Sequence, residues 1–391
     1  MSKIEDLIKQ YCPDGVEWKH LYEVTVWDKR FNSVERYKQP TVIDYKKYFL
    51  GEEQKQLVSD GGSVKILTTY ASNLYADENS VADYITDGEI VCIPWGGNAI
   101  VQYYKGKFVT GDNRIATSLD VNVLSNKYLY YMMQCNLHLI ASFYRGSGIK
   151  HPDMSKVLDI LIPVPPRPVQ DEIVRILDRF TELEKELEKE LELRRKQYEF
   201  YRDELLTFGD DVERKKLGEV CILSAGGDAP KTHMSKIKSD EYKYPIYSNG
   251  IGDNALYGYT DEYKISSPCV TVAARGTIGW AALRMEPFYP IVRLICVLPN
   301  DYDELNVSFL KYFIDIMEFP VPEGGIPQLT VPMLKNREIP IPSPTEQERI
   351  VKILDKFDTL TTSLTSGLPA EIKLRKQQYE YYRDYLFGLL N

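Results

Sequence analysis

Two stretches of the sequence carry apolar residues at alternating spacings of three and four. Such a spacing places one apolar stripe along a helix and is typical of helices that pair in a coiled coil. The first stripe consists of Ile173, Ile176, Phe180, Leu183, Leu187, Leu191, Arg194, Tyr198, Tyr201, Leu205 and Phe208. The second consists of Ile350, Ile353, Phe357, Leu360, Leu364, Leu368, Ile372, Arg375, Tyr379, Tyr382 and Leu386. We therefore predict two long helices.

Each predicted helix has one irregularity. In the first, the spacing of four is doubled between Leu187 and Leu191, a stutter that locally unwinds a coiled coil. The second is interrupted by "TSGLPA", where Pro369 has no amide to donate and Gly367 weakens the helix further. We predict a break near Ser366 to Pro369. Because a globular segment separates the two helices, we expect them to pair with each other, antiparallel.

Outside the helices, short apolar runs alternate with glycine turns, a pattern that predicts strands. The run "GEIVCIPWGGNAIVQYY" aligns with "SPCVTVAARGTIGWAAL" around Gly97 and Gly276. The loop "GSGIKHPDM" aligns with "EGGIPQLTV" through Gly148 and Gly325. The two globular segments therefore carry the same pair of glycine loops, with different polar residues in each copy.

The duplication covers nearly the whole chain. "IPVPPRPVQDEIV" returns as "IPIPSPTEQERIV", "LRRKQYEFYRDELL" as "LRKQQYEYYRDYLF", and "GVEWKHLYEV" as "DVERKKLGEV". We predict an α+β fold with a pseudo-two-fold internal repeat, in which two mixed, strand-rich domains are separated by two long helices that form an antiparallel coiled coil. The predicted boundaries are 1–163, 164–209, 210–342 and 343–391.

Composition adds few constraints. With 391 residues, 43% of them hydrophobic, the chain is long enough for two modest cores. No apolar run is long enough to cross a membrane, and the opening "MSKIEDLIKQ" is too charged for a signal peptide, so we expect a cytoplasmic protein without a membrane partner. The six cysteines are scattered without a CxxC pair, which indicates free thiols rather than a disulfide or metal framework.

The net charge of -9 argues against a nonspecific DNA binder. Acidic residues equal or outnumber basic ones in each predicted segment. If DNA is the ligand, positive charge must be gathered on one face, and the acidic excess must lie elsewhere. A structural coiled-coil scaffold that binds protein, without DNA specificity, also suits this balance.

The sequence offers no catalytic or metal site. The lone Pro-Pro pair, at Pro165, lacks the flanking residues of the motif with which an amino-methyltransferase holds its target amine. The sequence also contains no Walker loop for binding nucleotide phosphates. "PDGVEWK" imitates a nuclease pattern, but Asp14 and Glu17 are too close together to come from separate strands, and the second copy lacks the proline. We expect a non-catalytic protein.

These repeats resemble the specificity subunit of a type I restriction-modification system, over essentially the whole chain. The most specific marks are the two Ile-Pro-x-Pro entries, "QDEIVRILDRF" with "QERIVKILDKF", and "RKQYEFYRDELL" with "KQQYEYYRDYLF". The resemblance implies two target recognition domains, each reading half of a split double-stranded DNA sequence. It also implies partners that supply the chemistry: two methylation subunits using S-adenosylmethionine, and restriction subunits using ATP and Mg²⁺. The chain itself would hold no cofactor.

Residues that could contact DNA are chosen as side chains able to read base edges or hold phosphates. In the first domain they are Lys65, Thr68, Asn98, Arg114, Arg145, Lys150 and His151. In the second they are Lys231, His233, Lys236, Asn249, Arg275, Thr277, Arg293 and Gln328. Candidate residues for docking the methylation subunits are Glu182, Glu186, Lys189, Tyr198, Tyr201, Tyr379 and Tyr382. Each could instead be an ordinary surface residue.

Overall fold

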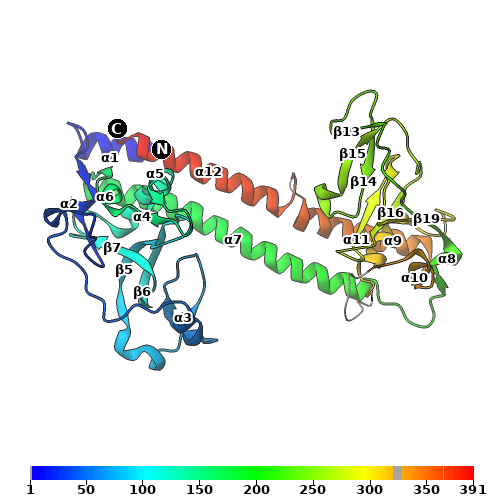
Figure 1. Cartoon of the computed structure of the whole chain (residues 1–391), viewed down its shortest axis with the longest axis horizontal. Helices are drawn as coiled ribbons and strands as arrows, with labels where there is room; N and C mark the ends of the chain where they lie inside the picture. Colours follow the sequence, from blue (N-terminus) through cyan, green and yellow to red (C-terminus); the bar gives the residue numbers. More distant parts are fainter. Residues whose placement is uncertain (1, 320–327, 364) are drawn as a thin grey trace. The chain divides into compact units, whose positions relative to one another are not determined.

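The computed structural model describes residues 2–319, 328–363 and 365–391 (Figure 1). They form two compact units. Unit 1 comprises Met1–Leu187 with Ile372–Asn391, and unit 2 comprises Glu188–Glu371. Each predicted helical region therefore supplies residues to both units. The aligned Gly325 and the stripe position Leu364 lie outside the described residues.

Unit 1 is built on a six-stranded sheet of order β2-β7-β5-β6-β3-β4, in which only β3 and β6 pair in parallel. Its strands are β2 Thr25–Trp27, β3 Val64–Ile66, β4 Tyr75–Ala76, β5 Thr86–Pro94, β6 Gln102–Val109 and β7 Asn113–Ser118. Helix α4 (Asn126–Cys135) packs on β5, and its side chains Tyr128 and Leu129 join Val91 and Ile93 in the core. Other elements of unit 1 are α1 Ser2–Tyr11, α2 Leu21–Val24, α3 Glu52–Leu57, α5 Leu137–Ser142, β8 Tyr144–Arg145, β9 His151–Pro152 and α6 Met154–Leu158.

Unit 2 contains two four-stranded sheets, of order β12-β19-β16-β17 and β13-β15-β14-β18. The first consists of β12 Cys221–Ala225, β16 Cys269–Ala273, β17 Ala281–Arg284 and β19 Leu294–Pro299. The second consists of β13 Met234–Ser235, β14 Tyr244–Tyr247, β15 Leu256–Thr260 and β18 Tyr289–Pro290. Every residue of β16 is buried, and α9 (Val307–Asp315) packs on it as α4 packs on β5. Unit 2 also contains two short helices, α8 Leu217–Val220 and α10 Val331–Lys335.

The repeated sequence segments pair with each other in space. In unit 1, β1 (Trp18–His20) is antiparallel to β10 (Leu161–Pro163), so the "VEWKHL" and "IPVPP" segments lie side by side. In unit 2, β11 (Arg214–Lys216) is antiparallel to β20 (Glu338–Pro340), which joins the second copies in the same way. The predicted internal repeat is confirmed down to this strand pair.

The predicted helices are α7 (Arg167–Leu205), α11 (Pro344–Thr362) and α12 (Leu368–Gly388). The predicted break in the second helix is confirmed between α11 and α12. Pro369 itself lies in the first turn of α12, where a missing amide proton costs little. None of these helices, nor any other in the described part of the chain, has the length and apolar character needed to span a membrane.

Within each unit, α7 pairs with a helix from the second helical region. In unit 1, Phe180 stacks on Tyr382 with ring centroids 5.2 Å apart, and Glu184 lies 3.2 Å from Lys376 of α12. Because residue numbers rise on one helix as they fall on the other, the two segments run antiparallel. In unit 2, Tyr201 of α7 stacks on Phe357 of α11 at 5.7 Å.

Candidate nucleic-acid interface

In unit 1, the loop that follows β5 meets β9. His151 Nδ1 lies 2.9 Å from the carbonyl oxygen of Trp95, and the two rings are 4.3 Å apart. The amide of Gly97 donates to the carbonyl of Lys150 at 2.9 Å. Gly97 has a φ of 96°, a conformation that favours glycine and explains the glycine in the turn. Two loops that the sequence aligned separately therefore form one surface, which carries the exposed Asn98.

Two arginines flank this surface. The guanidinium of Arg114, on β7, lies 5.7 Å from the ring centre of Trp95, within cation–π range. Burial lowers the pKa of Arg114, but a guanidinium remains charged at neutral pH. Arg145 on β8 pairs with His151 on β9 and is exposed. We call the set Trp95, Asn98, Arg114, Arg145, Lys150 and His151 the Trp95 patch.

The other two candidates of unit 1 serve the fold. Thr68 is only 2% exposed, and its hydroxyl donates to the carbonyl of Tyr70 at 2.6 Å. Its selection as a DNA contact is wrong, because a buried and internally bonded hydroxyl cannot reach a base. The Lys65 ammonium donates to the carbonyl of Ser72 and lies 4.9 Å from the ring centre of Tyr75, and burial lowers its pKa. This lysine is therefore half-buried beside the sheet.

In unit 2, the loop that follows β16 forms the repeat-related surface. Arg275 pairs with Gln328 in an isolated antiparallel bridge, and the amide of Leu329 donates to the carbonyl of Ala274 at 2.8 Å. The side-chain amide of Asn249 donates to the carbonyl of Arg275 at 2.7 Å. As in unit 1, the strand-turn loop and the second glycine-containing segment meet.

Arg293 completes this surface. Its carbonyl accepts from the amide of Ala274 at 2.9 Å, and its φ of 71° is unusual for a residue other than glycine. Its exposed side chain and that of Gln328 line a cleft of about 400 Å³. We call the set Asn249, Arg275, Thr277, Arg293 and Gln328 the Gln328 patch.

The remaining three candidates lie on the other sheet of unit 2. Lys236 follows β13, donates to the carbonyl of Tyr257 at 2.6 Å and lies 3.9 Å from the centre of that ring. His233 Nδ1 is 3.5 Å from a carboxylate oxygen of Asp261. Lys231 is exposed in the loop before β13. These three candidates therefore lie around β13, whereas Asn249, which follows β14 of the same sheet, bonds Arg275.

Trp95 is not among the predicted contacts, yet it is 39% exposed and packs against both His151 and Arg114. The sequence could have indicated this residue, because Trp95 directly precedes the glycine turn of the aligned loop. An exposed aromatic ring beside cationic side chains is a surface on which a nucleotide can stack.

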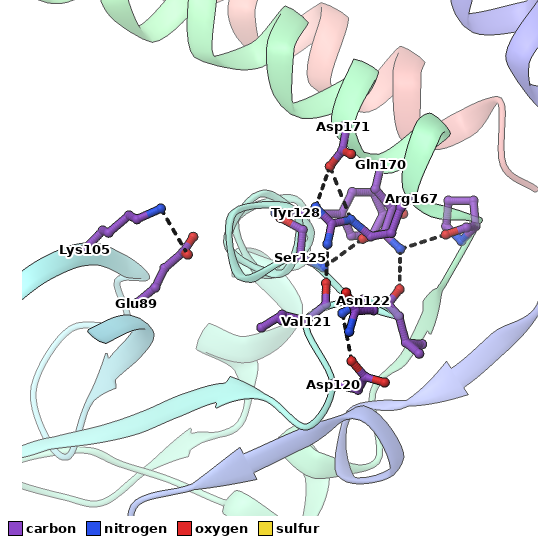
Figure 2. Close-up of polar contacts among 12 residues, drawn as sticks. Glu89, Lys105, Asp120, Val121, Asn122, Ser125, Tyr128, Arg167, Gln170 and Asp171 are labelled. Atoms are coloured by element: carbon purple, nitrogen blue, oxygen red, sulfur yellow. Dashed lines mark hydrogen bonds and ion pairs between the residues drawn. The ribbon is translucent and has the colours of Figure 1, made fainter. Parts of the chain in front are cut away.

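A buried glutamine of α7 bonds the segment at the start of α4 in unit 1 (Figure 2). The side-chain amide of Gln170 donates to the carbonyls of Val123 and Pro165, each at 2.7 Å, and Gln170 is fully buried. Its oxygen accepts from the backbone amide of Ser125 at 2.9 Å. Because Ser125 also caps α4, this one side chain links α7 to the helix that packs on β5.

Unit 2 repeats this arrangement with Gln347. Its side chain donates to the carbonyls of Glu304 and Pro342, both at 2.9 Å, and accepts from the amide of Asn306 at 2.8 Å. Asn306 caps α9, just as Ser125 caps α4. We call the two sets of contacts the glutamine clasps. They explain why this glutamine recurs in "QDEIV" and "QERIV".

Figure 2 also shows exposed ion pairs, among them Arg167 with Asp171 at 2.8 Å and Glu89 with Lys105 at 3.6 Å. Arg167 also donates to the carbonyl of Val121. Exposed pairs contribute about 0–1 kcal/mol each, so the buried clasp dominates this junction.

The candidate docking residues fall into two groups. Glu182, Glu186 and Lys189 are exposed on α7. The four tyrosines contact aromatic residues of their own unit, and burial raises the pKa of Tyr198 to about 12. Their ring contacts are Tyr198 and Tyr201 with Phe357, Tyr379 with Tyr131, and Tyr382 with Phe180. These tyrosines therefore already pack within their units.

The type I restriction modification DNA specificity domain matches residues 45–193 and 209–374, once in each half of the repeat. The chain belongs to the type I restriction-modification specificity family. The specificity subunit of the Escherichia coli EcoR124I/EcoR124II enzyme is 35% identical over 302 residues, covering 70% of this chain and 74% of that one. A Mycoplasma pneumoniae chain that carries the name of a type I specificity subunit is 34% identical over 326 residues, covering 79% and 96%.

The fold agrees with this membership. The crystal structure of a type I S subunit from M. genitalium superposes with a TM-score of 0.57, at 17% identity and over 96% of each chain. The resemblance found in the sequence is thereby confirmed. Specificity subunits recognise DNA as non-catalytic members of their complexes, so a scaffold without DNA specificity is not favoured.

Proposed function

We propose that each unit reads one half of a bipartite, asymmetric target in double-stranded DNA. The observation that carries this proposal is that the Trp95 patch and the Gln328 patch occupy repeat-related places, after β5 and after β16. Arginine, asparagine and glutamine are the side chains that form paired hydrogen bonds to guanine and adenine edges in the major groove. Each patch contains two arginines, together with one amide side chain in the Trp95 patch and two in the Gln328 patch.

The two patches carry different residues at corresponding positions. Trp95 and Asn98 in the unit 1 turn correspond to Ala274 and Thr277 in unit 2, by the alignment of Gly97 with Gly276. Because side-chain identity determines which base edge is read, the two half-sites differ in sequence. An identical pair of readers would instead favour a palindrome.

The helices α7, α11 and α12 have two roles in this proposal. They set the spacing between the half-sites, with the glutamine clasps fixing each reader on its helix. They also dock methylation subunits, two per chain, through exposed charges such as Glu182, Glu186 and Lys189. Those subunits would methylate adenine with S-adenosylmethionine, and restriction subunits would use ATP and Mg²⁺.

Methylome sequencing of the host strain tests this function. Deleting the gene removes methylation from one bipartite adenine motif, and restoring the gene on a plasmid restores it. A gene with Glu52→Ala, a change at an exposed pair on α3, serves as the control and restores the same motif. An unchanged methylome after deletion contradicts the proposal.

A further inference from the structure

In unit 1, the amino-terminal helix α1 lies beside the end of α12 (Figure 1), and its Ile4 shares one hydrophobic core with Ile173 of α7 and Leu386 of α12. Ile4 of α1 is fully buried there. The Lys3 ammonium lies 2.9 Å from Glu172 of α7, and the Tyr385 hydroxyl of α12 donates to Glu5 at 3.2 Å. An apolar face and two polar contacts therefore hold α1 in place.

Unit 2 has the repeat-related groove between the start of α11 and the end of α7. Its volume is about 730 Å³. The repeat equates Ile176 with Ile353 and Leu386 with Leu205, and both unit 2 residues line this groove. Its other lining residues are Gln197, Tyr201, Glu204, Thr207, Phe208, Glu346, Arg349 and Phe357.

Of the described residues, none takes the place of α1 in unit 2. In unit 1 the chain has residues 1–17 before β1 and uses them to build α1, whereas only 206–213 separate α7 from β11. The side chain of Glu172 is 5% exposed under α1, but its counterpart Arg349 is 53% exposed. Leu386 is fully buried, and its counterpart Leu205 is only half-buried. The unit 2 groove thus presents an apolar floor to solvent.

At corresponding positions, the two grooves carry polar side chains of opposite character. Glu172, which accepts Lys3, is replaced by Arg349, and Tyr385, which donates to Glu5, is replaced by Glu204. An α1 helix from a second copy of this chain would place Lys3 against Arg349 and Glu5 against Glu204. Like charges at this distance disfavour that occupant.

Arg349 can accept a further partner although it already bonds Glu346 of its own helix at 2.7 Å. Its counterpart Glu172 has the same kind of neighbour, Arg175 at 2.7 Å, and still bonds Lys3. The geometry of unit 1 therefore shows that a pair within the helix and a contact across the groove coexist at this position.

We propose that the unit 2 groove binds an amphipathic helix from a different polypeptide. This helix carries apolar residues at the positions of Ile4, Leu7 and Ile8, an acidic residue at the position of Lys3, and a basic residue at the position of Glu5. The proposal concerns a protein partner and does not rest on how the chain reads DNA.

Two fluorescent peptides test this with the full-length chain. One has the sequence of α1, SKIEDLIKQY, and the other exchanges its charges through Lys3→Glu and Glu5→Lys. Both carry a hydrocarbon staple on the solvent face, because a ten-residue helix is marginal in water. In fluorescence anisotropy, the charge-exchanged peptide binds saturably and at least about tenfold more tightly than the native one, which corresponds to about 1.4 kcal/mol.

Variants of the chain locate the binding. Arg349→Glu combined with Glu204→Lys reverses the preference, so that the native peptide binds more tightly. Glu192→Lys combined with Lys196→Glu, a double charge reversal at an exposed pair on α7 outside the groove lining, leaves the preference unchanged and serves as the control. Circular dichroism confirms that each variant is folded.

Three outcomes overturn the proposal. Failure of the charge-exchanged peptide to bind the folded wild-type chain means that the groove takes no such helix. Tighter binding of the native peptide means that a second copy of α1 is the occupant. Binding that ignores Arg349→Glu with Glu204→Lys places the peptide elsewhere.

Discussion

Replacing Gln170 with leucine removes one glutamine clasp while nearly preserving side-chain volume. The substitution leaves two carbonyls and one amide, those of Val123, Pro165 and Ser125, without their side-chain partner in a buried place. An unpaired buried polar group costs about 1–3 kcal/mol, and partial relaxation makes three such groups less than additive. We expect a loss of about 3 kcal/mol in the local stability of the α4–α7 junction.

Hydrogen exchange measured by mass spectrometry on α4 peptides reports this loss directly. A loss of about 3 kcal/mol accelerates exchange of the protected α4 amides about a hundredfold. The control is Gln197→Leu on the same helix, where the half-buried side chain bonds Arg194 rather than buried backbone. An acceleration below about tenfold, or one equal to that of the control, refutes the assigned role of Gln170.

The second clasp allows the same test in unit 2. Gln347→Leu accelerates exchange in α9, because Asn306 loses its partner there, and leaves α4 unchanged. Equal acceleration in α4 and α9 would show that the two clasps do not act separately.

Three further predictions concern charge and DNA contact. Contacts with Arg175 and then Lys3 lower the pKa of Glu172 from its ordinary 4.5 to about 2, so the stabilisation is present above pH 4.5 and is lost as the pH falls toward 2. Glu172→Gln therefore makes the urea midpoint fall less between pH 5 and pH 2.5, and a fall equal to that of the wild type contradicts this origin. Arg114→Ala and Gln328→Ala each weaken recognition by about 1–3 kcal/mol at one base of one half-site. The assay is methylation of base-substituted duplexes by the assembled complex. A loss of base recognition at both half-sites from a single substitution contradicts the proposal that each unit reads its own half-site. Lys150→Ala lowers the slope of binding against log salt by about 1 without altering sequence preference, and an unchanged slope excludes a phosphate contact.

Repetition made much of the fold predictable. The two copies of "IPxP" and of "VExKxL" had no assigned role as single motifs, but the structure pairs them as β1–β10 and β11–β20. The break before α12 followed from Gly367 and Pro369, because backbone chemistry acts locally. The sequence showed that Gln170 recurs as Gln347. Their role could not be predicted, because it depends on the capping residues of α4 and α9, which are distant in sequence.

The sites were less predictable because side-chain exposure is a property of the tertiary fold. Thr68 and Asn98 are both polar residues near a turn, but the first is buried against its own loop and the second is exposed. Arg349 and Glu172 occupy the same repeat position, and only the packing of α1 distinguishes a covered groove from an open one. Sequence alone could align these positions but could not show what covers them.

We propose above that each unit reads its own half of the target. Its most direct test is a methylome of a strain in which residues 210–342 are exchanged for the corresponding segment of a family member with a different second half-site. We expect one half of the methylated motif to change to that of the donor, while the other half and the spacing stay as they were. Methylation that keeps both original half-sites, or that changes both, would contradict it.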